Sequence, residues 1–95
     1  MKEFIFTVTD PDGIHARPAG LLVKEASKYN SQITIKLGDK NADAKKIFSI
    51  MGLAAKKSDN LQITVSGDDE NLAAKNLEEF LKNNMWGDLY AYLSG

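Results

Sequence analysis

Apolar and polar residues alternate in four short stretches of the chain, with the period expected of a strand that has one buried face. In the first stretch, residues 3–8, Phe4, Phe6 and Val8 would face inward, and the turn-forming DPDG at 10–13 ends the strand. The second stretch covers 32–38, a hairpin turn leads from it into a short strand at 40–44, and the fourth covers 61–67. The pattern therefore predicts four strands.

Three further stretches repeat apolar residues at steps of three and four, which indicates helices with one buried stripe. The first helix should begin just after His15, and the third should run over about residues 69–84. The second helix is short, and its stripe would consist of Ile47, Ile50, Met51 and Ala54. Phe48 and Leu53 are apolar but fall outside that stripe.

The predicted element order is strand, helix, strand, strand, helix, strand, helix. One-sided elements of this kind bury their apolar faces when all the helices stack on the same face of one sheet. We therefore expect an α+β fold, a two-layer open-faced sandwich with a four-stranded antiparallel sheet and three helices on one face. A chain of 95 residues is long enough for one domain, which we assign to residues 1–84, followed by an aromatic-rich extension at 85–95.

Charge and composition narrow the possible functions. With 12 basic and 13 acidic side chains the formal charge is −1, so the chain lacks the broad positive field that holds nucleic acid or anionic lipid. There is no cysteine and only one histidine, which argues against a metal site, and we expect no cofactor. No segment has the features of a signal peptide or the length of a membrane span, so we expect a cytoplasmic protein without membrane insertion.

The single histidine lies in the segment GIHARPAG, residues 13–20, at the predicted start of the first helix. A helix start presents unpaired N–H groups and the positive end of the helix dipole, and both attract anions. Pro18 suits the first turn of a helix, Gly13 lets the chain turn sharply, and Arg17 offers a planar fork of donors for phosphate oxygens. This combination favours a phosphoryl group carried on His15.

Two plainer interpretations of His15 stay open at this point. The histidine could be a surface residue that caps the helix, which is the more common situation for a lone histidine at a helix start. It could also act as a general base in hydrolysis, although no Ser/His/Asp set and no pair of acids is evident nearby.

GIHARPAG followed by LLVKEASKY resembles the active-site segment of the HPr family, the histidine-containing phosphocarriers of the bacterial phosphoenolpyruvate:sugar phosphotransferase system. The resemblance spans about residues 3–84 and includes the family's G-(I/L)-H-x-R-P-A motif. It implies that His15 accepts a phosphoryl group on Nδ1 from enzyme I and passes it to sugar-specific enzyme IIA proteins. It also implies that Arg17 pairs with the phosphate and that Ala16 and Arg17 supply N–H groups to it. Such a protein is a carrier with a phosphohistidine intermediate rather than a turnover enzyme.

The resemblance extends to a surface for partner proteins. Phe48, with Ile47 and Met51 beside it, resembles the family's contact patch on the second helix. Ile47 and Met51 are as well suited to the core, so Phe48 is the stronger contact candidate. Gly20 and Lys24 share one side of the first helix, and lysines there would speed the encounter with acidic partners.

Two other classes of function remain as alternatives. The first is a regulatory module of the same fold that binds a kinase or a transcription regulator, as family members that have lost the histidine do. Retention of His15 argues against it. The second is a nucleic-acid-binding sheet, which the net charge and the lack of an aromatic pair on an outer strand face argue against.

The chain departs from the family pattern at two positions near the motifs. Many Gram-positive members carry a kinase-regulated serine just before the second helix, and alignment without gaps places Lys46 there. Ser49 precedes IMG and could mimic the regulatory motif, but it lies further along the helix and would face another direction.

Asp12 stands where the family more often has a neutral residue; its carboxylate would repel a phosphate on His15 unless, as a turn residue, it points away.

The segment MWGDLYAYLSG, residues 85–95, extends beyond the usual end of the family and carries Trp86, Tyr90 and Tyr92. An aromatic cluster of this density is unusual in solvent. We expect the segment to fold back over the body of a monomer, with the pairing of two molecules as the alternative. Its composition is not that of a flexible linker, which argues against a cloning remnant.

Overall fold

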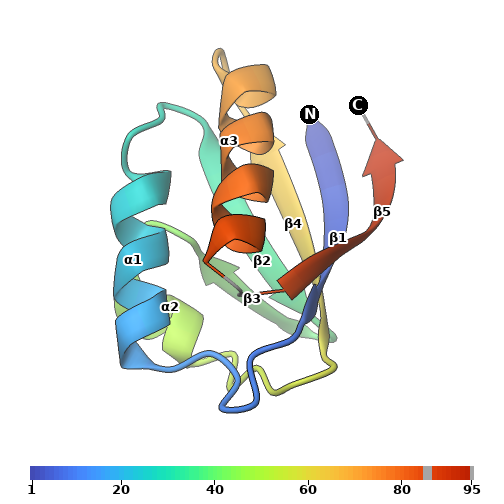
Figure 1. The fold of residues 1–95 in the computed structure, drawn as a ribbon. Coiled ribbons are helices and arrows are strands. Elements are labelled where there is room, and N and C mark those ends of the chain that lie inside the picture. Colours follow the sequence, from blue (N-terminus) through green and yellow to red (C-terminus); the bar gives the residue numbers. More distant parts are fainter. Residues whose placement is uncertain (85–86, 95) are drawn as a thin grey trace.

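The computed structural model describes residues 1–84 and 87–94 of the chain. These ranges form five strands and three helices, which are labelled in Figure 1. In chain order they are β1 Lys2–Val8, α1 Ala16–Ala26, β2 Gln32–Leu37, β3 Lys40–Asp43, α2 Ile47–Met51, β4 Asn60–Ser66, α3 Glu70–Asn83 and β5 Gly87–Ser94.

The strands form one antiparallel sheet in the order β3-β2-β4-β1-β5, and the helices lie on one face of it (Figure 1). The open-faced α+β sandwich is thus confirmed. The prediction of four strands was wrong, because residues 87–94 add a fifth strand along the free edge of β1. The two strands pair from Glu3↔Ser94 to Val8↔Gly87, with two register shifts between. The C-terminal segment therefore folds back over its own chain; Trp86 lies outside the described residues.

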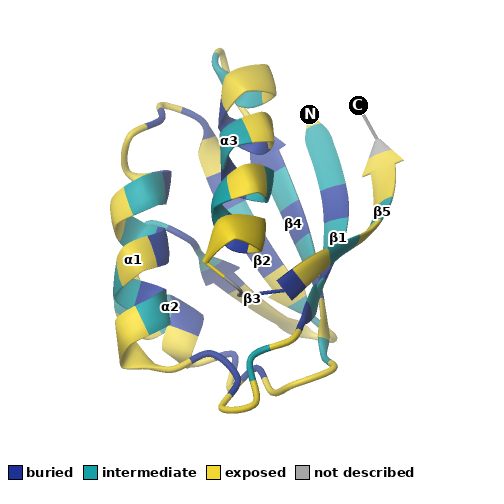
Figure 2. Cartoon of the chain, in the orientation of Figure 1, coloured by how far each residue is buried: buried dark blue, intermediate teal, exposed yellow. Residues whose placement is uncertain are grey.

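The core lies between the sheet and the helices, as the dark-blue residues in Figure 2 show. Alternate residues of β1 from Phe4 onward, of β2 and of β4 are buried, except that Leu37 at the end of β2 is only partly buried; this confirms the alternation in the sequence. The residues that α1 and α3 contribute to the core also follow helical spacing; they are Ala19, Leu22, Ala26, Ala73, Ala74, Leu77 and Leu81. Burial of these apolar faces is the main force that holds the two layers together.

The second helix differs from its predicted stripe. Ile50 is buried as expected, but Met51 and Ala54 are exposed, and Leu53 is buried with 2% of its surface accessible. The helix ends at Met51 and the backbone of Ala54 has a φ of 51°. Helical spacing therefore does not continue past residue 51, and the next turn of chain brings Leu53 to the core instead.

A carboxylate just before α3 forms hydrogen bonds with the loop that follows α1. Asp69 immediately precedes α3, but its side chain does not cap that helix. It accepts hydrogen bonds from the backbone N–H groups of Asn30 and Ser31, at 2.8 and 2.9 Å, and from the hydroxyl of the buried Ser31. These bonds lower the pKa of Asp69, the Ser31 hydroxyl contributing most. The loop before β2 is thereby fixed against the loop after β4.

Among the described residues, no helix is long and apolar enough to cross a bilayer.

Candidate functional site

The loop between β1 and α1 is held in place from both sides. Within the loop, the Asp10 carbonyl accepts the Gly13 N–H at 2.9 Å, and the Asp10 carboxylate accepts the Asp12 N–H at 2.8 Å. Across the loop, the Ile14 N–H donates to the Ala55 carbonyl at 3.0 Å, and the Ile14 side chain is buried. The residue just before His15 is therefore anchored to the core.

Gly13 is required for this close approach. Its φ is +69°, a region that other residues adopt at a cost, and a Cβ at this position would lie 2.3 Å from the Ala55 carbonyl oxygen. Only a residue without a side chain allows the loop to pack so closely against residue 55. The sequence signal, a glycine two residues before the histidine, thus has a specific structural cause.

His15 occupies the N-cap position of α1 with an extended backbone, φ −125° and ψ −173°. Its imidazole makes no capping hydrogen bond and is exposed. The structure therefore does not show the side-chain cap that the plainer interpretation requires. The first helical bond runs from the Ala19 N–H to the His15 carbonyl at 2.9 Å, so the helix itself supplies no acceptor for the N–H groups of Ala16 and Arg17. Pro18 has no N–H to satisfy.

The imidazole opens onto a shallow pocket of about 200 Å³. Its lining consists of Asp10, His15, Arg17, Pro18, Leu21 and Asn84. The predicted pair His15 and Arg17 is thus brought to one pocket. Sequence reasoning missed three residues of the lining. Asp10 was interpreted only as part of a turn, Asn84 follows the end of α3 and carries no local signal, and Leu21 is 43% exposed one turn after Arg17.

Two carboxylates lie beside the imidazole. Asp10, Asp12 and His15 each offer a carboxylate oxygen or ring nitrogen, and these atoms all lie within 4.8 Å of one another. The expectation that Asp12 forms part of a turn is met, but the idea that its carboxylate points away is wrong. The turn made by Asp10 brings residue 12 back toward the start of the helix. Exposed acidic groups commonly lie this close without an ion. Asp10 also lines the His15 pocket, so an anion bound there would have a negative charge beside it.

Residues 2–83 match the family model of the HPr component phosphorylation site of the phosphotransferase system. The chain belongs to the HPr family. The match contains the GIHARPAG segment and the whole of the exposed site described above, apart from Asn84. The protein is therefore a phosphocarrier of the phosphotransferase system.

Individual members of the HPr family agree over most of the chain. The phosphocarrier protein HPr of Lysinibacillus sphaericus is 43% identical over 81 residues, which cover 85% of this chain and 92% of that protein. The histidine-containing phosphocarrier protein of Mycoplasma has a similar structure, with a TM-score of 0.86 at 34% identity, and the match covers 90% of this chain and 97% of that one. The structure of the catabolite repression protein Crh of Bacillus subtilis matches with a TM-score of 0.70 at 29% identity, and the match covers 79% of this chain and 86% of that one.

The residues of the predicted partner surface lie on α1 and α2. Phe48 is 82% exposed, Met51 is also exposed, and Lys24 is exposed on α1. Ile47 is half-buried and packs against the core, and a Cβ on Gly20 would lie 3.7 Å from the Ile47 Cδ1. Gly20 and Ile47 therefore bring the two helices together, whereas Phe48 and Met51 face solvent.

Lys46 and Ser49 have different environments at the second helix. Lys46 is the exposed N-cap residue of α2, and its N–H donates to the Asp43 carbonyl at 3.0 Å. The half-buried Ser49 accepts a hydrogen bond on its hydroxyl oxygen from the Asp43 N–H at 2.9 Å. The Ser49 hydroxyl thus supports the connection between β3 and α2.

Proposed function

We propose that His15 accepts a phosphoryl group on Nδ1 from enzyme I and donates it to enzyme IIA proteins in the cytoplasm. The observation that carries this proposal is the exposed imidazole of His15, which makes no capping bond, at a helix start that it shares with Arg17. In the accepting step, the Nδ1 lone pair forms the bond to phosphorus as the donor's bond to phosphorus breaks. The donating step is the reverse, with a nucleophile of enzyme IIA as the acceptor.

Charge stabilisation would come from groups that are already in place. The N–H groups of Ala16 and Arg17 point out of the helix start, where an anion is favoured by the helix dipole. The Arg17 guanidinium can form two parallel hydrogen bonds to phosphate oxygens. Because phosphoryl transfer depends mainly on positioning and charge stabilisation, these three donors suffice for a carrier whose partners supply the remaining groups.

Phe48, Met51 and Leu21 are exposed apolar residues on α1, which carries the site, and on α2, which packs against α1, and they support docking of a partner there. Lys24 would act mainly on the rate at which acidic partners are encountered. Gly20, which has no side chain, and the side chain of Ile47 would act indirectly, by setting the packing of α2 on α1.

The test is incubation of the protein with enzyme I and phosphoenolpyruvate, followed by intact mass measurement. We expect the wild type to gain one acid-labile phosphate and His15→Ala to gain none. His15 is the only histidine, so an acid-labile label on the variant would overturn the assignment. Lack of any label on the wild type, with an enzyme I that labels another family member, would overturn the function itself.

We further propose that regulation by a serine kinase is absent at the usual position, because Lys46 stands there. Incubation with the HPr serine kinase and ATP should leave the protein unmodified. A second incubation with Lys46→Ser should restore labelling if the surrounding helix still fits the kinase. Labelling of the wild type at Ser49 would show instead that the kinase uses the later serine.

A further inference from the structure

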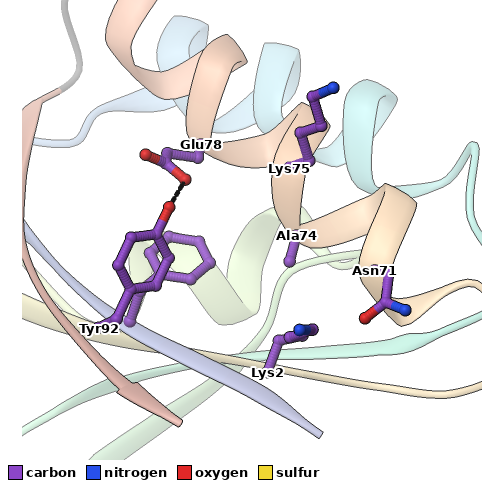
Figure 3. A pocket seen from close by; sticks show the side chains of 7 residues that line it. Lys2, Asn71, Ala74, Lys75, Glu78 and Tyr92 are labelled. Carbon is purple, nitrogen blue, oxygen red and sulfur yellow. Dashed lines mark hydrogen bonds between the residues drawn. The ribbon is translucent and has the colours of Figure 1, made fainter. Parts of the chain in front are cut away.

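A second pocket lies between α3 and the edge of the sheet formed by β1 and β5 (Figure 3). Its volume is about 450 Å³, which falls in the range of sites for small molecules. The residues that line it come from β1, α3 and β5; they are Lys2, Phe4, Asn71, Ala74, Lys75, Glu78 and Tyr92. The lining shares no residue with that of the His15 pocket, so the two sites are separate.

The apolar surface of this second pocket comes from Phe4, Ala74 and Tyr92. The Tyr92 ring lies edge-on to the Phe4 ring, with centroids 6.3 Å apart and an angle of 61° between the planes. Phe4 and Ala74 are buried, whereas Tyr92 is 62% exposed and is the aromatic residue that a ligand can reach. Its hydroxyl donates a hydrogen bond to the Glu78 carboxylate of α3, drawn as a dashed line in Figure 3. The pocket therefore has an aromatic wall that is tied to α3.

The charged groups of the lining are either offset by other charges or directed away from the cavity. The pKa of the Glu70 carboxyl is lowered, mainly by a hydrogen bond from the N-terminal ammonium and in part by the charge of Lys2, so Lys2 has a carboxylate nearby. Figure 3 shows the Lys75 ammonium pointing away from Lys2 and Tyr92. Glu78 already accepts the Tyr92 hydrogen bond. The lining thus offers an ionic ligand no uncommitted opposite charge within the described part of the chain.

Asn71 provides a neutral polar group on the side of the pocket away from Tyr92 (Figure 3). Its carboxamide forms no hydrogen bond with another side chain or backbone group of the residues that the structure describes. A carboxamide carries an acceptor oxygen and N–H donors side by side, so it can form two parallel hydrogen bonds with the amide of a ligand. Since both partners are neutral, this pairing requires no counter-charge.

We propose that this pocket binds a small uncharged aromatic molecule that carries an amide group, with its ring against Tyr92 and Ala74 and its amide toward Asn71. The aromatic wall and the apolar floor favour a flat ring, because binding removes apolar surface from water. The carboxamide of Asn71 favours a group with both a donor and an acceptor. A charged ligand would lose hydration there without gaining an uncommitted opposite charge.

The test uses benzamide as the probe, titrated into the full chain and followed by the backbone amide signals in NMR spectra. We expect saturable shifts at Asn71, Ala74 and Tyr92. Affinity should be about fivefold lower for methyl benzoate, which has no N–H donor, and for benzoate, which is charged. Equal or higher affinity for either analogue would overturn the proposal, as would the absence of saturable shifts at these residues with tens of millimolar benzamide.

Two matched pairs of variants locate the binding site. Asn71→Ala and Asn83→Ala each remove an exposed carboxamide from α3, and Tyr92→Leu and Tyr90→Leu each remove an exposed ring from β5. Only the first variant of each pair changes the lining of the pocket. We expect it to weaken benzamide binding about fivefold and the second to leave binding unchanged. Equal affinities within the asparagine pair would overturn the proposal even if Tyr92→Leu releases β5.

Discussion

The loop before His15 and the C-terminal strand β5 both depend on a glycine that lets one backbone approach another. A Cβ on Gly13 would lie 2.3 Å from the Ala55 carbonyl oxygen, and one on Gly87 would lie 2.1 Å from the Thr7 carbonyl oxygen. The consequences of the two contacts differ. Gly13 is anchored on both sides and has a positive φ, whereas Gly87 begins a terminal edge strand that pairs with β1 alone. The first contact positions the reactive residue, and the second adds a wall to an existing domain.

The largest effect should come from Gly13→Val. Valine is strained at a φ of +69°, and its Cβ would also clash with the Ala55 backbone. Because no local movement relieves both the strain and the clash, we expect the free energy of unfolding to fall by about 3 kcal/mol or more. Urea denaturation would measure this, and phosphorylation of the remaining folded protein should also be slower. Unchanged stability would show that the loop is less tightly held than the contact with Ala55 indicates.

Gly87→Val should have a smaller effect, because β5 is an edge strand that pairs with β1 alone. Six pairs link the two strands, and at a few tenths of a kcal/mol for each pair we expect a loss of about 2 kcal/mol. Removal of residues 85–95 provides the control and sets the upper limit for the loss. In both proteins the rate of phosphorylation by enzyme I should stay within about twofold of wild type; a larger decrease would mean that β5 supports the His15 site.

Arg17→Lys tests the site without changing the fold. Lysine keeps the charge but loses the planar fork, so we expect phosphoryl acceptance to slow by about tenfold while the unfolding midpoint is unchanged. Rapid-quench measurement of labelling by enzyme I gives the rate. An equal rate in the variant would mean that charge alone, and not paired hydrogen bonding, is what Arg17 provides.

Asp12→Asn should have the smallest effect and the opposite sign. A carboxylate oxygen of Asp12 lies within 4.8 Å of both a ring nitrogen of His15 and a carboxylate oxygen of Asp10. Its negative charge would repel a phosphoryl group on His15. Removing the charge should make the phosphohistidine about threefold longer-lived, and the difference should shrink at high salt. A shorter lifetime in the variant would show that Asp12 helps to hold the phosphorylated state.

The contrast between the loop before His15 and β5 also explains which features could be predicted from the sequence. The alternation of residues such as Phe4 and Phe6 and the helical spacing from Ala19 to Ala26 are local, so they indicated the sheet and the helices directly. His15 and Arg17 are two residues apart in a short motif at a helix start, so their shared pocket was also predictable. The pairing of β5 with β1 joins opposite ends of the chain, and its two register shifts interrupt the alternation by which a strand is recognised.

The approach of Asp12 and Asn84 to the imidazole could not be predicted for a related reason. The position of Asp12 depends on the turn that Asp10 makes with its own carboxylate, and that of Asn84 depends on where α3 ends above the sheet. Neither position follows from residue type or spacing, since both arise only when the loop and the helix are packed.

The most direct test of the phosphocarrier account is transfer out of the phosphorylated protein. The wild type would be labelled with enzyme I and phosphoenolpyruvate, separated from enzyme I, and mixed with an enzyme IIA protein, and the intact mass of both proteins would be followed with time. The account predicts that phosphate lost from His15 is gained in equal amount by enzyme IIA. Release as inorganic phosphate, or retention on His15 with no label on any enzyme IIA that accepts phosphate from another family member, would contradict it.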